Sequence, residues 1–194
     1  MATCCLSPVV ASAQTGDDST YTSPNGDIVI NRPAGVEWQV DSDAYYFDVK
    51  IYVNDADQTN GFVAITQDLL SSGAPQFGSY QSFIYSAIQC DQKDDVQLGG
   101  HDGVEITCSM TKDALENSYL FRGVDLRSFD HNVLTIRFNQ IIVNDILYTI
   151  IGFDGDRSKD KVSVDKILNN IHLHGLGEQV GAKRIETTYP EISL

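Results

Sequence analysis

The clearest pattern in the chain lies in residues 133–153, where two runs rich in β-branched residues are separated only by Asn144-Asp145. From residue 134 to 142 the apolar side chains fall mainly at alternate positions, the period-two pattern of a strand with one face on a core. Residues 146–153 are apolar at nearly every position, as is typical of a strand covered on both faces. Asn and Asp tolerate the positive φ of a two-residue turn. The segment is therefore predicted to be a β-hairpin whose second strand lies in the middle of a sheet.

Shorter runs with strand character occur on both sides of this hairpin. Glycine-rich residues 99–103 are predicted to form a second hairpin turn, and the charged residues 91–95 an exposed connection. Further strands are expected at residues 27–30, 36–40, 45–53, 62–69, 96–98, 104–108 and 119–126. In the third of these, the alternation places the apolar residues on one face and Asp48, Lys50 and Tyr52 on the other.

Two segments show helical periodicity instead. Apolar residues recur at spacings of three and four in residues 77–88, where Ser79 can act as the N-cap, and again in residues 164–171. The first helix is predicted to end near Cys90, and residues 111–117 to form one helical turn or a loop. Helices inserted between groups of sequential strands indicate an α+β fold rather than a doubly wound sheet.

Composition and charge narrow the class of protein. A chain of 194 residues with 42% hydrophobic content can bury a core and fits one domain. Acidic residues outnumber basic ones by 27 to 13, which argues against nucleic acid and anionic membranes as partners. No apolar run approaches the roughly 18 residues of a membrane span. We expect a signal segment at residues 1–13, a flexible lead-in at 14–26, one domain at 27–174 and an irregular tail at 175–194.

The first thirteen residues bear on the compartment. They are small, apolar and uncharged and end in Ala11-Ser12-Ala13, a pattern that signal peptidase accepts. They lack a basic start, and Pro8 interrupts the apolar run, so the segment is either a truncated leader or a chance likeness. We expect export to a periplasmic or extracellular space, and a cytoplasmic location if the leader interpretation is wrong.

The cysteines fit this expectation. Cys4 and Cys5 fall in the leader, which leaves Cys90 and Cys108 in the body of the chain. Two cysteines in an oxidising compartment predict one disulfide, here between a helix end and a strand, whereas a reducing compartment predicts two buried thiols.

Three short segments carry a family resemblance. They are the Arg-Pro-x-Gly-x-x-Trp run at residues 32–38, the hairpin core at 143–150 and the helical residues 164–171. Their order resembles the PsbP-like fold, the superfamily of the extrinsic photosystem II proteins, a Ran-binding import factor and several exported bacterial lipoproteins. The resemblance covers residues 27–173. It implies a central antiparallel sheet of about six to eight strands flanked by helices in an α/β/α sandwich, and a non-enzymatic protein that binds or helps assemble a larger partner. Contact residues for photosystem II or Ran are not recognisable, so neither role is carried over.

Candidate metal chemistry is concentrated after the central hairpin. Oxygen-bearing residues stand at positions 1, 3, 5, 7 and 12 of an EF-hand-like register, at Asp154, Asp156, Ser158, Asp160 and Asp165. Lys159 stands where glycine normally makes the turn, and Arg157 and Lys161 oppose a cation. These departures favour a solvated connection in which Ser158 or Ser163 caps the last helix, so no cofactor is expected. Calcium bound at this register is the alternative.

Histidines provide two weaker patterns. His101-Asp102 could orient an imidazole by a carboxylate, but adjacent residues on a turn usually point apart, which favours a surface loop. His172 and His174 could share a transition metal, although no third ligand is evident and a helix-end position explains them equally simply.

No common catalytic motif is present: the chain lacks a P-loop, Gly-x-Ser-x-Gly and His-Glu-x-x-His. We therefore expect a non-catalytic, exported binding or assembly factor that acts through protein–protein contacts. The alternatives are an intracellular adaptor of the same fold and a hydrolase with an unrecognised site.

Overall fold

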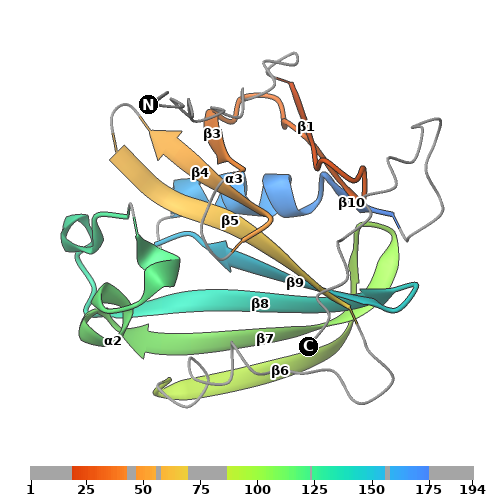
Figure 1. The fold of residues 1–194 in the computed structure, drawn as a ribbon. Helices are drawn as coiled ribbons and strands as arrows, with labels where there is room; N and C mark the ends of the chain where they lie inside the picture. Colours follow the sequence, from red (N-terminus) through yellow and green to blue (C-terminus); the bar gives the residue numbers. More distant parts are fainter. Residues whose placement is uncertain are drawn as a thin grey trace, which may run out of the picture.

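A computed structural model gives the fold (Figure 1), and it describes residues 19–42, 47–55, 58–69, 87–122, 124–155 and 158–174. The strands of this part of the chain form two antiparallel sheets, one of seven strands in the order β3-β4-β5-β9-β8-β7-β6 and one of three in the order β1-β2-β10. The seven-stranded sheet confirms one part of the predicted α+β fold, the central antiparallel sheet of six to eight strands. The strands are β1 (Thr20–Thr22), β2 (Ile28–Asn31), β3 (Trp38–Asp41), β4 (Val49–Asp55), β5 (Gln58–Leu69), β6 (Gln89–Leu98), β7 (His101–Thr111), β8 (Val133–Val143), β9 (Ile146–Phe153) and β10 (Ile171–Leu173).

The central hairpin forms as predicted. Asn144 and Asp145 adopt φ values of 46° and 65°, the left-handed conformation that a tight two-residue turn requires. Every residue of β9 is buried, and β9 is the fourth of the seven strands. Because β9 is hydrogen-bonded on both edges and covered on both faces, its sequence needs no polar alternation.

Two apolar clusters lie on opposite faces of the large sheet. On the first face, α3 (Ser158–Leu168) packs on β4, β5 and β9, and the small sheet completes this cluster. On the second face, the connection between β7 and β8 lies over the sheet; it contains α2 (Lys112–Glu116) and two 3₁₀ turns, η1 (Tyr119–Phe121) and η2 (Leu126–Ser128). The predicted sandwich with helices on both faces is not confirmed, because in the described ranges only α3 exceeds two turns.

The predicted first helix lies mostly outside the described residues. Its last residue, Ile88, is described and is not helical, and β6 begins at Gln89, so the prediction of a helix that reaches Cys90 is wrong. The predicted connection at residues 91–95 is part of β6 as well. The pairing of β6 with β7 shifts register between Lys93 and Val96, as in a β-bulge. A strand at the edge of a sheet tolerates this polar sequence, because it is paired on one side and need not be buried.

Three further segments differ from the predictions. The segment predicted as a strand at 119–126 instead contains η1 at residues 119–121 and the start of η2 at Leu126, because its buried apolar side chains cover the sheet. Ile171 continues the helical spacing but belongs to β10, where it pairs with Ile30 of β2. Residues 20–22 of the predicted flexible lead-in form β1, which pairs with the other edge of β2. In the last two cases a long-range pairing outweighs local sequence preference.

Candidate functional site

The connection between β7 and β8, residues 112–122 and 124–132, is referred to here as the cap. Local hydrogen bonds start its helical turns. The Thr111 hydroxyl accepts a hydrogen bond from the backbone N–H of Ala114 and caps α2. The Asp125 carboxylate accepts one from the N–H of Arg127 and caps η2. These two N-capping hydrogen bonds explain why this segment forms turns where the sequence pattern predicted an extended strand.

Aromatic contacts hold the cap on the sheet. The ring of Phe121 meets Phe62 of β5 and Phe153 of β9 edge to face, at centroid distances of 5.3 and 4.8 Å. The ring of Phe129 also meets Phe153 edge to face, at 5.5 Å. Such pairs contribute about 0.5–1.5 kcal/mol each beyond the burial of their area. The cap is therefore anchored at both of its 3₁₀ turns.

A buried lysine fixes the first half of the cap. Lys50 of β4 is only 2% exposed, and its ammonium donates hydrogen bonds to the carbonyls of Leu120 (2.8 Å) and Arg122 (3.0 Å). It also lies over the rings of Tyr52 and Phe62, 4.7 and 4.5 Å from their centroids. Burial lowers the pKa of Lys50 from 10.5 to about 8, against the opposing effect of the Asp41 carboxylate.

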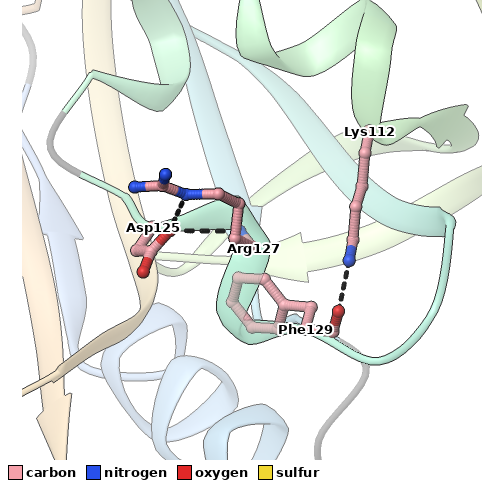
Figure 2. A network of polar contacts seen from close by, with 4 residues as sticks. All are labelled: Lys112, Asp125, Arg127 and Phe129. Atoms are coloured by element: carbon pink, nitrogen blue, oxygen red, sulfur yellow. Dashed lines mark hydrogen bonds and ion pairs between the residues drawn. The ribbon is translucent and has the colours of Figure 1, made fainter.

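A second lysine fixes the other half, as Figure 2 shows. The ammonium of Lys112, at the start of α2, donates a hydrogen bond to the Phe129 carbonyl. Beside it, Arg127 and Asp125 form an ion pair at 3.3 Å, with side chains 88% and 58% exposed. A surface pair of this kind contributes little to stability. The cap therefore presents charged side chains to solvent from a backbone that two lysines hold in place.

The cap forms one side of an open cleft of about 440 Å³. Its lining combines apolar and charged side chains, from Glu116, Phe121, Val124, Asp125, Leu126 and Arg127. A second cleft, of about 410 Å³, lies at the Arg-Pro-x-Gly-x-x-Trp run, where the Arg32 side chain donates a hydrogen bond to the Val36 carbonyl at 2.8 Å and Gly35 has a φ of 73°. Both linings thus combine apolar side chains with carboxylate and guanidinium groups, which can contact a partner through apolar packing and ion pairs.

The predicted calcium register is only partly described. The Arg137 side chain of β8 lies between the first and last residues of this register, 3.5 Å from the Asp154 carboxylate and 2.5 Å from the Asp165 carboxylate. Ser158 and Asp160 lie within α3, and Asp156 falls outside the described residues. In the described ranges no group of three or more His, Cys, Asp or Glu side chains could hold a metal ion. Calcium binding remains a prediction, and the geometry shows two of its proposed ligands engaged by an arginine.

The two cysteines of the domain lie directly opposite each other on β6 and β7. The Cys90 and Cys108 sulfurs are 2.09 Å apart, a covalent distance, and the Cα atoms are 4.1 Å apart. This close approach is typical of a non-hydrogen-bonded antiparallel pair. The predicted pairing is supported, but it joins two strands and not a helix end and a strand.

The histidine patterns do not assemble into sites. The Nε2 atom of His101 lies 3.2 Å from the Leu173 carbonyl, while Asp102 accepts a hydrogen bond from Gln97, so these neighbours have separate partners. His172 lies on β10 and His174 follows it, so the predicted helix-end position is wrong.

Sequence reasoning missed the role of Lys50. The alternation correctly placed this residue on the face of β4 away from Ile51, but a lysine in that register is expected to reach solvent. Local sequence does not reveal this burial, because Lys50 is covered by the cap, whose residues 119–121 and 126–128 fold as 3₁₀ turns.

The fold and the clefts together describe a β-rich protein with two open clefts among its described residues. No family model matches the chain, and no curated protein matches it in sequence. No helix in the described ranges is long and apolar enough to cross a membrane.

Comparison with solved structures finds chains of similar fold. Cyanobacterial PsbP (CyanoP) from Synechocystis sp. PCC 6803 is 14% identical, with a TM-score of 0.45 over 87% of this chain and 100% of that chain. A protein from Bacteroides thetaiotaomicron VPI-5482 is 12% identical, with a TM-score of 0.44 over 82% of this chain and 50% of that one. Both are likenesses of fold at low sequence identity, and the first is to a PsbP protein, the class that the sequence motifs resemble.

Proposed function

We propose that this chain is a non-catalytic, exported binding or assembly protein that contacts a protein partner through the cap. The observation that carries the proposal is that two lysines anchor the cap. The ammonium groups of Lys50, on β4, and of Lys112, at the start of α2, donate hydrogen bonds to backbone carbonyls of the cap. A loop held in one conformation loses little further conformational entropy when it binds. Rigidly positioned loops commonly carry binding functions.

The chemistry of the cleft indicates the kind of contact. Phe121 and Leu126, each only 4% exposed, form the apolar floor of the cleft beside the half-buried Val124, and the exposed Arg127 supplies a guanidinium at the rim. Aromatic and arginine side chains are enriched among the residues that dominate interface energies. The cap thus suits a partner that inserts an apolar side chain and places a carboxylate or a backbone carbonyl near Arg127.

Export is supported by two features of the chain. One is the small, apolar, uncharged segment at residues 1–13, and the other is the closeness of the Cys90 and Cys108 sulfurs. Disulfides persist in oxidising compartments and are rare in the cytosol. N-terminal sequencing of the protein purified from its source tests this part, and a mature chain that retains Met1 would refute export by cleavage at Ala13.

The binding role is tested by affinity capture from the source organism with the full chain and two charge-reversal variants. Arg127→Glu alters the cap, whereas Lys166→Glu makes the same change on α3, against the opposite face of the sheet. We expect a protein that the wild type and Lys166→Glu recover equally and that Arg127→Glu recovers at least about tenfold less, since about 1.4 kcal/mol accounts for a tenfold change in affinity. Equal recovery by all three chains would rule out the cap as the binding surface. Turnover of broad hydrolase substrates would favour the enzymatic alternative.

A further inference from the structure

Segments from near the two ends of the described chain meet where β2 begins and β10 ends. Asp27 directly precedes β2, His174 directly follows β10, and the His174 backbone N–H donates a hydrogen bond to the Asp27 carbonyl at 2.8 Å. The Tyr148 hydroxyl, from β9 of the large sheet, donates a hydrogen bond to the His174 carbonyl at 2.9 Å. Asp27, Tyr148 and His174 are referred to here as the clasp, because they join the small sheet to the large one.

The Asp27 side chain is buried in the clasp without a partner. Asp27 is only 3% exposed, and in the described ranges its carboxylate takes part in no hydrogen bond or ion pair. The turn before β2 holds it there: the Ile28 N–H donates a hydrogen bond to the Ser23 hydroxyl at 3.0 Å, and the Ser23 N–H donates one to the Ile28 carbonyl at 2.9 Å. Burial without a partner disfavours the charged form of a carboxyl group. Asp27 therefore binds a proton more tightly in the clasp than in water.

The electrostatics of the clasp follow from this burial. Burial raises the pKa of Asp27, and the His174 imidazole opposes that rise, because its positive form favours the carboxylate. Burial, together with the Asp27 and Asp48 carboxylates, raises the pKa of Tyr148 to about 12. The Tyr148 hydroxyl therefore keeps its proton at acidic and neutral pH, and its hydrogen bond to His174 does not titrate there.

Three further titratable groups lie beside the clasp. The Asp48 carboxylate, just before β4, accepts a backbone hydrogen bond from β5 at 2.7 Å, and desolvation raises its pKa. The Tyr21 hydroxyl of β1 donates a hydrogen bond to the Asp48 carbonyl at 3.4 Å, and burial raises the pKa of Tyr21. The His101 Nε2 atom of β7 lies 3.2 Å from the Leu173 carbonyl of β10. Asp48 is thus a second carboxyl group with a raised pKa, which a test of Asp27 has to separate.

We propose that the clasp is a pH-dependent device, which holds β10 on β2 more tightly as the pH falls. When β10 separates from β2, the Asp27 carboxyl returns to water and to its ordinary pKa of 3.8. Closing therefore takes up a proton between pH 3.8 and the raised pKa, so this contribution to stability is full below pH 3.8 and is lost as the pH rises through the raised value. At neutral pH the carboxylate is charged, buried and unpaired, and the clasp opens more readily.

Opening the clasp changes the surface that the protein presents. Ile28 and Ile30 of β2 are fully buried, and their partners across the pairing are Leu173 and Ile171 of β10. Separation of β10 uncovers these side chains, which belong to the apolar cluster beneath α3. The clasp thus makes the exposure of this apolar surface depend on pH.

The test is amide hydrogen exchange of the ¹⁵N-labelled full chain, followed by NMR from pH 4 to pH 8 and corrected for the intrinsic exchange rate at each pH. We expect the amides of β10 and His174 in the wild type to lose protection as the pH rises, by at most about tenfold per pH unit because one proton is linked to opening. Asp27→Asn keeps the shape of the side chain but cannot titrate. Its β10 amides should lose most of this dependence, and at pH 7 they should be at least about threefold more protected than those of the wild type, because the buried group is uncharged.

Two matched variants separate Asp27 from other carboxyl groups. Asp48→Asn removes the neighbouring carboxyl that also has a raised pKa, and Asp130→Asn removes an exposed one from the cap. Both should retain the wild-type dependence of β10 protection on pH. Protection of β10 that does not vary with pH in the wild type, or that varies equally in Asp27→Asn, would overturn the proposal. Equal protection of the amides in β10 and β8 would do the same, because β10 would then separate only when the whole domain unfolds.

Discussion

Lys50 allows the sharpest test of how the cap is held. The unfolded chain keeps the proton of this lysine up to about pH 10.5, whereas the folded chain releases it near pH 8, because burial disfavours the charged form. Between these two pH values the unfolded state binds more protons, so the free energy of unfolding increases with pH. At about 1.4 kcal/mol per pH unit, the expected gain is about 3 kcal/mol across the window.

The perturbation is Lys50→Met, which keeps the length of the side chain but removes the amine. At neutral pH we expect a loss of about 1–3 kcal/mol, because the Leu120 and Arg122 carbonyls lose their donor. Denaturant unfolding without reductant is measured at several values from pH 7 to pH 10.5, for the wild type and the variant.

The difference in the free energy of unfolding between the two proteins reports on Lys50, since other groups titrate equally in both. We expect that difference to be nearly constant below pH 8 and to grow by about 3 kcal/mol by pH 10.5. The control is Lys166→Met, which removes an exposed lysine of α3 and should give a difference that does not vary with pH. A constant or shrinking difference for Lys50→Met would refute the conclusion that this ammonium is desolvated.

Three further predictions concern stability and are checked by denaturant unfolding. Arg137→Met leaves the buried Asp154 carboxylate without its cation and should cost about 3 kcal/mol, whereas Arg127→Met breaks an exposed pair and should cost less than about 1 kcal/mol; similar losses would contradict this contrast. Gly155→Ala forces a Cβ into the Phe129 ring at a φ of 62°, so it should be about 2 kcal/mol more destabilising than Gly26→Ala, which has a φ of 75° but open space. Reducing the disulfide, which spans 18 residues, should lower stability by about 3 kcal/mol, and no change would show that it does not constrain the unfolded chain.

The parts of the fold that the sequence predicted are those fixed by local chemistry. Residues 133–153 combine alternation, a fully apolar return strand and a two-residue turn, and all three act over a few residues. The hairpin turn at Gly99-Gly100 was predicted for the same reason, and both glycines have positive φ. The face assignment in β4 was correct at Val49 and Ile51, because period two does not depend on what covers the strand.

The parts that were missed depend on distant segments. β10 has three residues and exists because it pairs with β2, which no local pattern near Ile171 reveals. The sequence predicts a connection at the charged residues 91–95, which lie in β6. An edge strand remains paired without alternating apolar and polar side chains. The cap was hidden in the same way, because it depends on Lys50, which lies more than sixty positions earlier in the chain.

The pairing of β2 with β10 sets the order in which this protein can be completed during synthesis. β2 lies near the start of the described chain and β10 at its end, and Ile28 and Ile30 are fully buried only when both are present. A growing chain can therefore form the pairings among β4 to β9 while β2 is paired with β1 alone and still lacks β10. Contacts between segments so far apart in sequence form slowly, since the closure entropy of the intervening chain comes first. The apolar cluster beneath α3 thus stays open until β10 has been synthesised, and a chain arrested before Ile171 would expose it to chaperones or to aggregation.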